Sequence, residues 1–138
     1  MSEHLESRAV SLLDDCEDIT VASVNDEGYP RACVVSKLRN EGLSAIYFST
    51  GAISTKVRHF RDNHRASVCY YRGGDSVTLV GDAEIVDDTE KKEEVWQDWL
   101  INHFPKGVGD PNYCVVRFIP REATIWIGQE FATVSLTR

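Results

Sequence analysis

Short stretches of alternating apolar and polar residues dominate the chain from residue 19 onward. Such alternation puts every second side chain on one face and is typical of β-strands with one buried side. Clusters of glycine, proline and asparagine separate the stretches and indicate turns. The pattern predicts seven strands, at residues 19–25, 30–38, 43–49, 65–72, 76–86, 113–120 and 123–128. Seven short strands with few long helices predict a mainly β protein, a small antiparallel barrel with flanking α-helices.

Three other segments have apolar residues at helical spacing. Residues 3–16 form the first, and residues 54–64 form a short second one. A third helix is predicted to open at a capping box of Asp87 with Glu90 and to end at Pro105. Its apolar stripe contains two tryptophans, for which we expect a core or subunit-interface position rather than contact with a ligand. The stripe comprises Val95, Trp96, Trp99, Leu100 and His103.

The composition is that of an ordinary soluble globule and fits a single domain over residues 1–138, with 42% hydrophobic and 27% charged residues. No apolar run approaches the roughly 18 residues of a membrane span. The N-terminus MSEHLESRAVSLL is acidic and lacks the basic and apolar regions of a signal peptide. We therefore expect a cytoplasmic protein that does not associate with a membrane.

The four cysteines are widely spaced and contain no C-x-x-C pair. Three of them, Cys33, Cys69 and Cys114, lie inside predicted strands. Buried free thiols explain this distribution better than disulfides or a metal site. The four histidines form no spaced cluster with cysteines or carboxylates, so no metal site is predicted.

The net charge of −7 is unevenly distributed along the chain. Residues 31–72 contain eight Lys and Arg but only Glu41 and Asp62, a local charge of +6, so the remainder carries −13. A basic middle in an acidic chain indicates an anionic ligand that binds locally. The alternative is that helix 54–64 has a solvated basic face. Extended nucleic acid is disfavoured, because the acidic remainder would repel its phosphates.

The stretch YFSTGAISTKVRHF, residues 47–60, concentrates hydroxyl groups and a lysine where a strand turns into a helix. Ser54 is a suitable N-cap, and the first turn of a helix presents unpaired N–H groups and the positive end of the helix dipole. Gly51 would allow the tight turn that returns Thr50 towards Ser54. These groups predict a phosphate socket, although an ordinary capped helix is an alternative. The socket residues are Thr50, Ser54, Thr55 and Lys56.

The spacing T-x-x-x-S-x-K, preceded by an aromatic-rich strand, resembles the FMN-phosphate segment of the pyridoxamine 5′-phosphate oxidase-like split barrels. The strand PRACVVSK is similar to the arginine-led strand whose backbone lines the flavin ring in that family. SVTLVGDAEIV, the acidic helix with tryptophans, YCVVRFIP and ATIW then follow in the order of its small general stress proteins. The resemblance extends over residues 15–128. It implies an antiparallel FMN-binding split β-barrel and a homodimer with FMN at the subunit interface.

The resemblance also implies which residues bind the cofactor. Groups at the start of helix 54–64 would hold the phosphate, and the backbone of residues 31–36 would border the flavin ring. Trp126 either covers the flavin from the partner subunit or is a core residue of the barrel. The full cofactor-binding set is Arg31, Ala32, Cys33, Val34, Ser36, Ser49, Thr50, Ser54, Thr55, Lys56, Ser76 and Trp126.

Several positions depart from the vitamin oxidases themselves. Thr55 stands where they have an arginine, and Ser76 stands where they have a glutamine. Lys37 falls one place beyond their matching lysine, which leaves Ser36 at that position. The stretch IGQEFATVSLTR shows no counterpart of the segment that completes their vitamin-phosphate site. These departures argue against oxidation of pyridoxine phosphate while leaving flavin binding intact.

We expect an FMN-dependent oxidoreductase with an unidentified small-molecule substrate or electron donor. The flavin would supply the redox chemistry, and no catalytic residue is assigned, because no nucleophile–base pair or paired-carboxylate site stands out. The alternative is a non-catalytic binder of flavin, haem or a deazaflavin that is involved in the stress response. A third hypothesis, which the negative charge disfavours, is a barrel that stacks single-stranded nucleic acid. Its stacking residues would be Tyr47, Phe48, Tyr70 and Tyr71.

Overall fold

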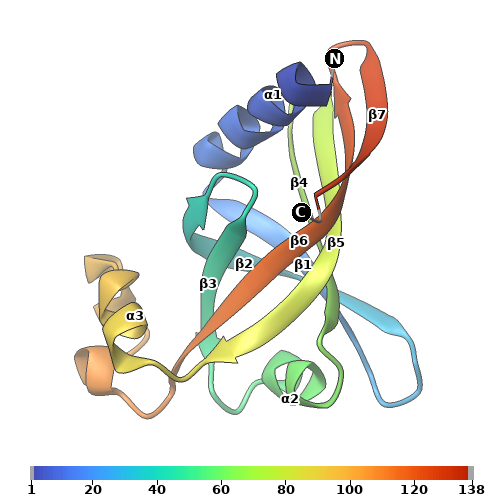
Figure 1. Cartoon of the computed structure of the whole chain (residues 1–138). Helices are drawn as coiled ribbons and strands as arrows, with labels where there is room; N and C mark the ends of the chain where they lie inside the picture. The colour runs from blue at the N-terminus through green and yellow to red at the C-terminus, as the bar shows by residue number, and fades with distance from the viewer. Residues whose placement is uncertain (1, 137–138) are drawn as a thin grey trace.

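The computed structural model describes residues 2–136, and this part of the chain is mainly β-structure with short helices around it (Figure 1). In chain order its elements are α1 (Ser2–Asp15), β1 (Asp18–Val24), β2 (Pro30–Glu41), β3 (Ala45–Gly51), α2 (Thr55–Asp62), β4 (Arg65–Arg72), β5 (Asp75–Val86), α3 (Thr89–Glu94), the 3₁₀ helices η1 (Asp98–Asn102) and η2 (Gly107–Gly109), β6 (Tyr113–Ile127) and β7 (Glu130–Ser135).

The described strands form one antiparallel sheet in the order β3-β2-β1-β4-β5-β6-β7, and β3 also pairs with β6. This extra pairing closes six strands into a barrel, while β7 extends β6 beyond it. The predicted antiparallel barrel with flanking helices is therefore confirmed. α1 and α2 lie at opposite ends of the barrel (Figure 1).

The apolar side chains gather in two places. Inside the barrel, residues such as Phe48, Leu79 and Phe118 form a core that α1 closes at one end and α2 at the other. The Tyr70 hydroxyl donates to the Ala9 carbonyl at 2.9 Å and ties α1 to β4. A second cluster lies where η1 and its neighbours pack on β3 and β6, and it contains Tyr47, Val95, Leu100, Phe104, Tyr113 and Val115. This cluster fixes η1 beside the end of β3.

One long strand, β6, replaces the two strands predicted at 113–120 and 123–128. Its first half pairs with β3 up to Phe118, and its second half pairs with β7 from Glu122 onward. Pro120 lies between these two pairings. Proline has no N–H to donate, and because neither β3 nor β7 pairs with Pro120, no ladder hydrogen bond is lost on that side. The strand can therefore continue through a residue type that usually ends a strand. Strand β7 was not predicted.

The third predicted helix is shorter than expected. α3 begins after Asp88, whose carboxylate accepts the N–H of Glu90 at 3.0 Å, so the N-cap is Asp88 and the capping box predicted at Asp87 is wrong. The helix ends at Glu94, and η1 follows after a break. Trp96 packs edge-on against Tyr113, whereas Trp99 remains 41% exposed, so the core prediction fits only the first tryptophan.

All four cysteines are free thiols, as predicted, although only Cys114 is fully buried. Within residues 2–136, no group of His, Cys, Asp and Glu side chains is arranged to hold a metal ion. No helix in this range is long and apolar enough to cross a membrane. Tyr47, Phe48 and Tyr70 are buried, which removes the stacking platform that the nucleic-acid hypothesis requires.

Candidate functional site

β2 has an open edge along its first half. Residues 30–36 pair with β1, but only residues 37–41 pair with β3. The Lys37 N–H donates to the Glu17 carbonyl at 2.8 Å, and bonding alternates along an antiparallel ladder. The N–H and C=O groups of Ala32, Val34 and Ser36 therefore face away from β1, towards the gap that β3 leaves. This gap is the split in the barrel.

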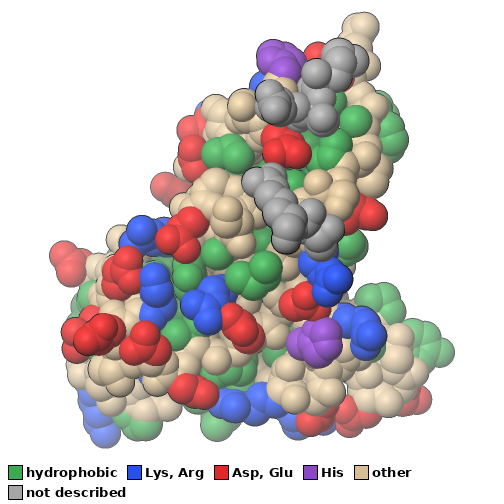
Figure 2. Space-filling view, viewed as in Figure 1, with side chains coloured by type: hydrophobic (Ala, Val, Ile, Leu, Met, Phe, Trp, Pro, Cys, Tyr) green, Lys and Arg blue, Asp and Glu red, His purple; other side chains and the backbone are tan. Residues whose placement is uncertain are grey.

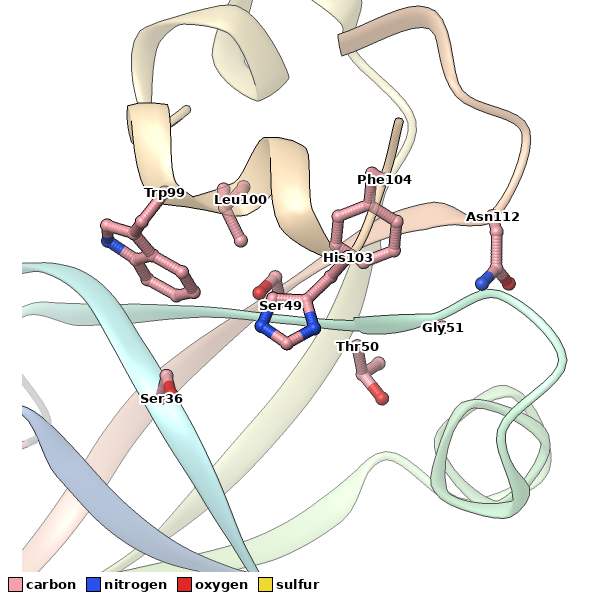
Figure 3. A pocket seen from close by; sticks show the side chains of 9 residues that line it. All are labelled: Ser36, Ser49, Thr50, Gly51, Trp99, Leu100, His103, Phe104 and Asn112. Atoms are coloured by element: carbon pink, nitrogen blue, oxygen red, sulfur yellow. The ribbon is translucent and has the colours of Figure 1, made fainter. Parts of the chain in front are cut away.

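A cavity of about 350 Å³ lies next to the split. Ser36 of β2 and the end of β3 line one side, and η1 lines the other. Figure 3 shows Trp99 and His103 extending from η1 towards the strand that carries Ser49 and Thr50. A second cavity of about 440 Å³ shares Ser36 and Trp99 with it and continues along β2. The two cavities give a flat molecule access to the open edge.

Three of the residues predicted to bind a phosphate lie together at the start of α2. The Lys56 ammonium donates to Thr50 Oγ1 at 3.0 Å, and Thr50 Oγ1 donates to Ser54 Oγ at 3.2 Å. Lys56 makes no ion pair with any residue in the described range. An ammonium, two hydroxyls and a helix N-terminus thus converge on one point, as an anion requires.

Ser54 takes the N-cap position, but its hydroxyl does not cap the helix. It accepts the hydrogen of Thr50 instead. The N–H groups of the first turn are consequently left without a side-chain acceptor from Ser54, which suits a site for an external anion. Thr55, also predicted for the socket, is exposed and makes no side-chain hydrogen bond within residues 2–136.

Asn112 holds the turn between β3 and α2, a role for which its GDPN loop carries no specific sequence signal. The Ala52 N–H donates to the Asn112 backbone and side-chain oxygens, at 2.9 and 3.0 Å. A Cβ on Gly51 would lie 3.2 Å from the Asn112 side chain. Gly51 does not have a positive φ. The glycine at this turn therefore permits the close contact with Asn112, and its backbone is not left-handed.

Arg31 lies at the end of the barrel that α2 covers. It pairs with Ser23 on β1, and paired residues share a face of the sheet. The buried Ser23 hydroxyl in turn contacts Nδ1 of His59 on α2 at 2.9 Å. No carboxylate in the described range pairs with Arg31. The barrel end that carries the socket thus has at least two cations, Arg31 and Lys56, without an acidic partner in the described range.

Lys37 lines the second cavity, but its ammonium is already hydrogen-bonded within the protein. Its ammonium donates to the Leu13 carbonyl and to Asn40 Oδ1, and burial lowers the pKa of this amine. The ammonium is thus held by α1 and by a neighbouring side chain of its own strand. Ser36 Oγ itself contacts Asp18 Oδ1 at 3.5 Å.

Ser76 and Trp126 are neighbours across β5 and β6, and the structure does not bring them to the socket. Within the barrel, β1 and β4 separate β5 from β2. Trp126 is 55% exposed on the outer face and packs edge-on against Phe131 at 5.9 Å. The alternative that Trp126 is a barrel core residue is wrong. Tyr71 pairs with Ser76, so these strands present one exposed row, the aromatic row: Tyr71, Ser76, Trp126 and Phe131.

Trp99 and His103 line the cavity although the sequence had assigned both to an apolar stripe. Their rings meet edge to face at 6.1 Å. Leu100 and Phe104 also line this cavity, but both are buried in the second core cluster and anchor η1 beside it. His103 is the titratable side chain among the residues that line this cavity. A histidine on an otherwise apolar stripe was the available signal for it.

A sequence profile described as pyridoxamine 5′-phosphate oxidase matches residues 5–127. The chain belongs to the pyridoxamine 5′-phosphate oxidase family. Among curated proteins, none matches it in sequence. The family membership agrees with the resemblance found in the order of strands and in the socket spacing.

Several solved structures have the same fold as this chain. A Clostridium acetobutylicum protein related to general stress protein 26 matches with a TM-score of 0.88 and 23% identity, over 99% of this chain and 97% of that one. General stress protein 26 from Bacillus anthracis matches with a TM-score of 0.80 and 21% identity, over 95% and 99%. A haem-binding protein from Mycobacterium smegmatis matches with a TM-score of 0.76 and 16% identity, over 95% and 57%.

Proposed function

We propose that the protein binds FMN in the split of its barrel and acts as an FMN-dependent oxidoreductase. The observation that carries the proposal is the juxtaposition of an anion socket with an open backbone edge across one cavity. The socket matches a phosphate, because it offers an ammonium, hydroxyls and helix N–H groups. The edge matches a flat heterocycle, because it offers alternating donors and acceptors in one plane.

Different residues would bind the two ends of the cofactor. Lys56, Thr50 and Ser54 would bind the phosphate, with Arg31 contributing charge at the same end of the barrel. The backbone N–H groups of the open edge would donate to the pyrimidine side of the ring and stabilise negative charge there. Bound FMN would supply the redox chemistry, and the chain would orient it and set its electrostatics.

The active unit we propose is a homodimer with FMN at its interface. Ser76 and Trp126 of one subunit cannot border its own β2 edge, because β1 and β4 intervene. A second copy can bring its aromatic row to that edge, next to Val34, which is 69% exposed. Burial of Tyr71, Trp126 and Phe131 in such an interface would remove a large apolar surface from water.

The visible spectrum of the purified protein tests the proposal most directly. We expect a yellow protein with flavin absorbance, or a colourless one that binds FMN in a ratio of one per chain when it is reconstituted. Turnover with a reduced nicotinamide donor and a small-molecule acceptor, assayed anaerobically, would then separate an oxidoreductase from a flavin store. Protein that neither contains nor takes up FMN would refute the proposal.

Haem is the second candidate, and His103 is the observation that favours it. An imidazole that points into a cavity beside Leu100 and Phe104 is a chemically suitable axial ligand for haem iron. A haem-binding protein also shares the fold. A Soret band in the spectrum that shifts or disappears in His103→Ala would favour haem. A flavin spectrum unchanged by that substitution would exclude this role for His103.

A further inference from the structure

A third cavity, on the outer face of the barrel, lies away from the split and has a different chemistry. It measures about 510 Å³ and lies over β1, β4 and β5. Its floor consists of small and apolar side chains, and basic groups surround its rim. The floor contains Ala22, Val24, Pro30, Ser67 and Val80, and the rim contains His64, Arg65, Asp82 and Arg121. Basic side chains and a histidine gather in the region of α2 and β4 in Figure 2.

A β-bulge directs Arg121 to this rim. Val80 pairs with Glu122 while Gly81 pairs with Pro120, so Arg121 is the extra residue of β6. Bulges re-aim the side chain of the extra residue. Gly81 is required for it, because a Cβ there would lie 2.1 Å from the Ile119 carbonyl oxygen. The bulge brings the Arg121 guanidinium to Asp82, at 3.3 Å.

Both carboxylate oxygens of Asp82 have hydrogen-bond partners. One accepts from His64 Nδ1 at 2.7 Å, and the other contacts Arg121. Partial burial acts to raise the pKa of Asp82, but the hydrogen bonds from His64 and Arg121 hold it below its ordinary value. The carboxylate is thus ionised at neutral pH. It also orients the imidazole, whose Nε2 is left for another partner.

Arg65 has no such partner. It lies directly opposite Asp82 in the β4–β5 pairing, yet its guanidinium makes no ion pair or hydrogen bond with any residue in the 2–136 range. The rim has two guanidinium groups, those of Arg65 and Arg121, against the one carboxylate of Asp82, an excess of one positive charge among these three groups. A planar monoanion would neutralise this charge and match the fork of an arginine.

We propose that this cavity binds a small monocarboxylate with an apolar body, at a site separate from the socket on α2. The carboxylate pairs with Arg65 and Arg121, and the apolar body lies on the floor of Ala22 and Val80. The site lies four residues further along the strands than the aromatic row, about 13 Å away. It does not depend on the identity of the cofactor.

Benzoate is the probe that tests this site. Isothermal titration should detect saturable binding of benzoate, and benzamide, which has the same shape without the charge, should not bind. Arg65→Ser and Arg121→Ser should each weaken benzoate binding by at least about tenfold. Arg61→Ser removes an exposed arginine elsewhere and is the matched control; it should leave benzoate binding unchanged. Circular dichroism should give the same spectrum for all three variants.

Three results would overturn the proposal. Benzoate affinity that is equal in wild type and Arg65→Ser would show that the basic rim does not hold the carboxylate. Inorganic phosphate that binds with equal affinity and the same dependence on Arg65 would overturn the assignment to monocarboxylates. Absence of benzoate binding, together with loss of the dimer in Arg65→Ser, would assign the rim to an ion pair between subunits instead.

Discussion

Replacement of Lys56 by alanine removes the ammonium that lies beside Thr50 at the start of α2. Its Nζ is 3.0 Å from Thr50 Oγ1 and pairs with no carboxylate among residues 2–136, so the ligand-free protein loses only one hydrogen bond. A bound phosphate would lose a charge-assisted contact worth about 1.5–3 kcal/mol. We therefore expect the Kd for FMN to rise by roughly 10- to 150-fold, with little change in stability.

The assay compares FMN with riboflavin, which has the same ring system and no phosphate. Quenching of flavin fluorescence gives both affinities on ligand-free protein. Lys56→Ala should weaken FMN binding and leave riboflavin binding unchanged, and added salt should reduce the difference for FMN. Lys106→Ala, at an exposed lysine outside the socket, is the matched control. Unchanged FMN affinity, or equal losses for both ligands, would contradict the assignment of Lys56 to the phosphate.

Three further predictions concern the interface, the bulge and a buried phenol. Trp126→Arg should convert the dimer to a monomer, measured by light scattering after gel filtration; an unchanged mass would place the interface elsewhere. Gly81→Ala should lower the free energy of unfolding in urea by about 3 kcal/mol or more, because its Cβ would clash with the Ile119 carbonyl, whereas Gly74→Ala, in open space, should be nearly neutral. Burial raises the pKa of Tyr113 to about 12. The unfolded chain ionises this phenol near pH 10 and the native state does not, so stability should fall between about pH 10 and 12. Tyr113→Phe should reduce that fall. An identical pH profile in the variant would argue against Tyr113 as the group responsible.

Much of the fold was predictable from local patterns. Alternation located β1 to β5 within a few residues, because a strand with one buried side imposes a period of two on its side chains. The socket was also predictable, since Thr50, Ser54 and Lys56 are close in sequence and the helix start brings them together. β6 was divided in error at Pro120, because a proline normally ends a ladder and only the change of partner from β3 to β7 accommodates it.

The rest of the site depends on contacts between residues that are distant in sequence. The open edge of β2 exists because β3 leaves it after Phe48 and continues along β6 alone. Trp99 and His103 line the cavity because Leu100 and Phe104 pack into the second core cluster and hold η1 beside the end of β3. No local pattern encodes either fact.

The sequence by itself determined most of the elements, the clustering of Thr50, Ser54 and Lys56, and the family, because backbone preferences and side-chain periodicity act over a few residues. Only the tertiary structure decided that Trp126 faces outward, away from its own socket, and that Arg121 turns at a bulge towards Asp82. Both depend on which strands are neighbours and in which register they pair. That choice is made by the packing of the whole barrel, where one step of register exchanges the buried and exposed faces of a strand.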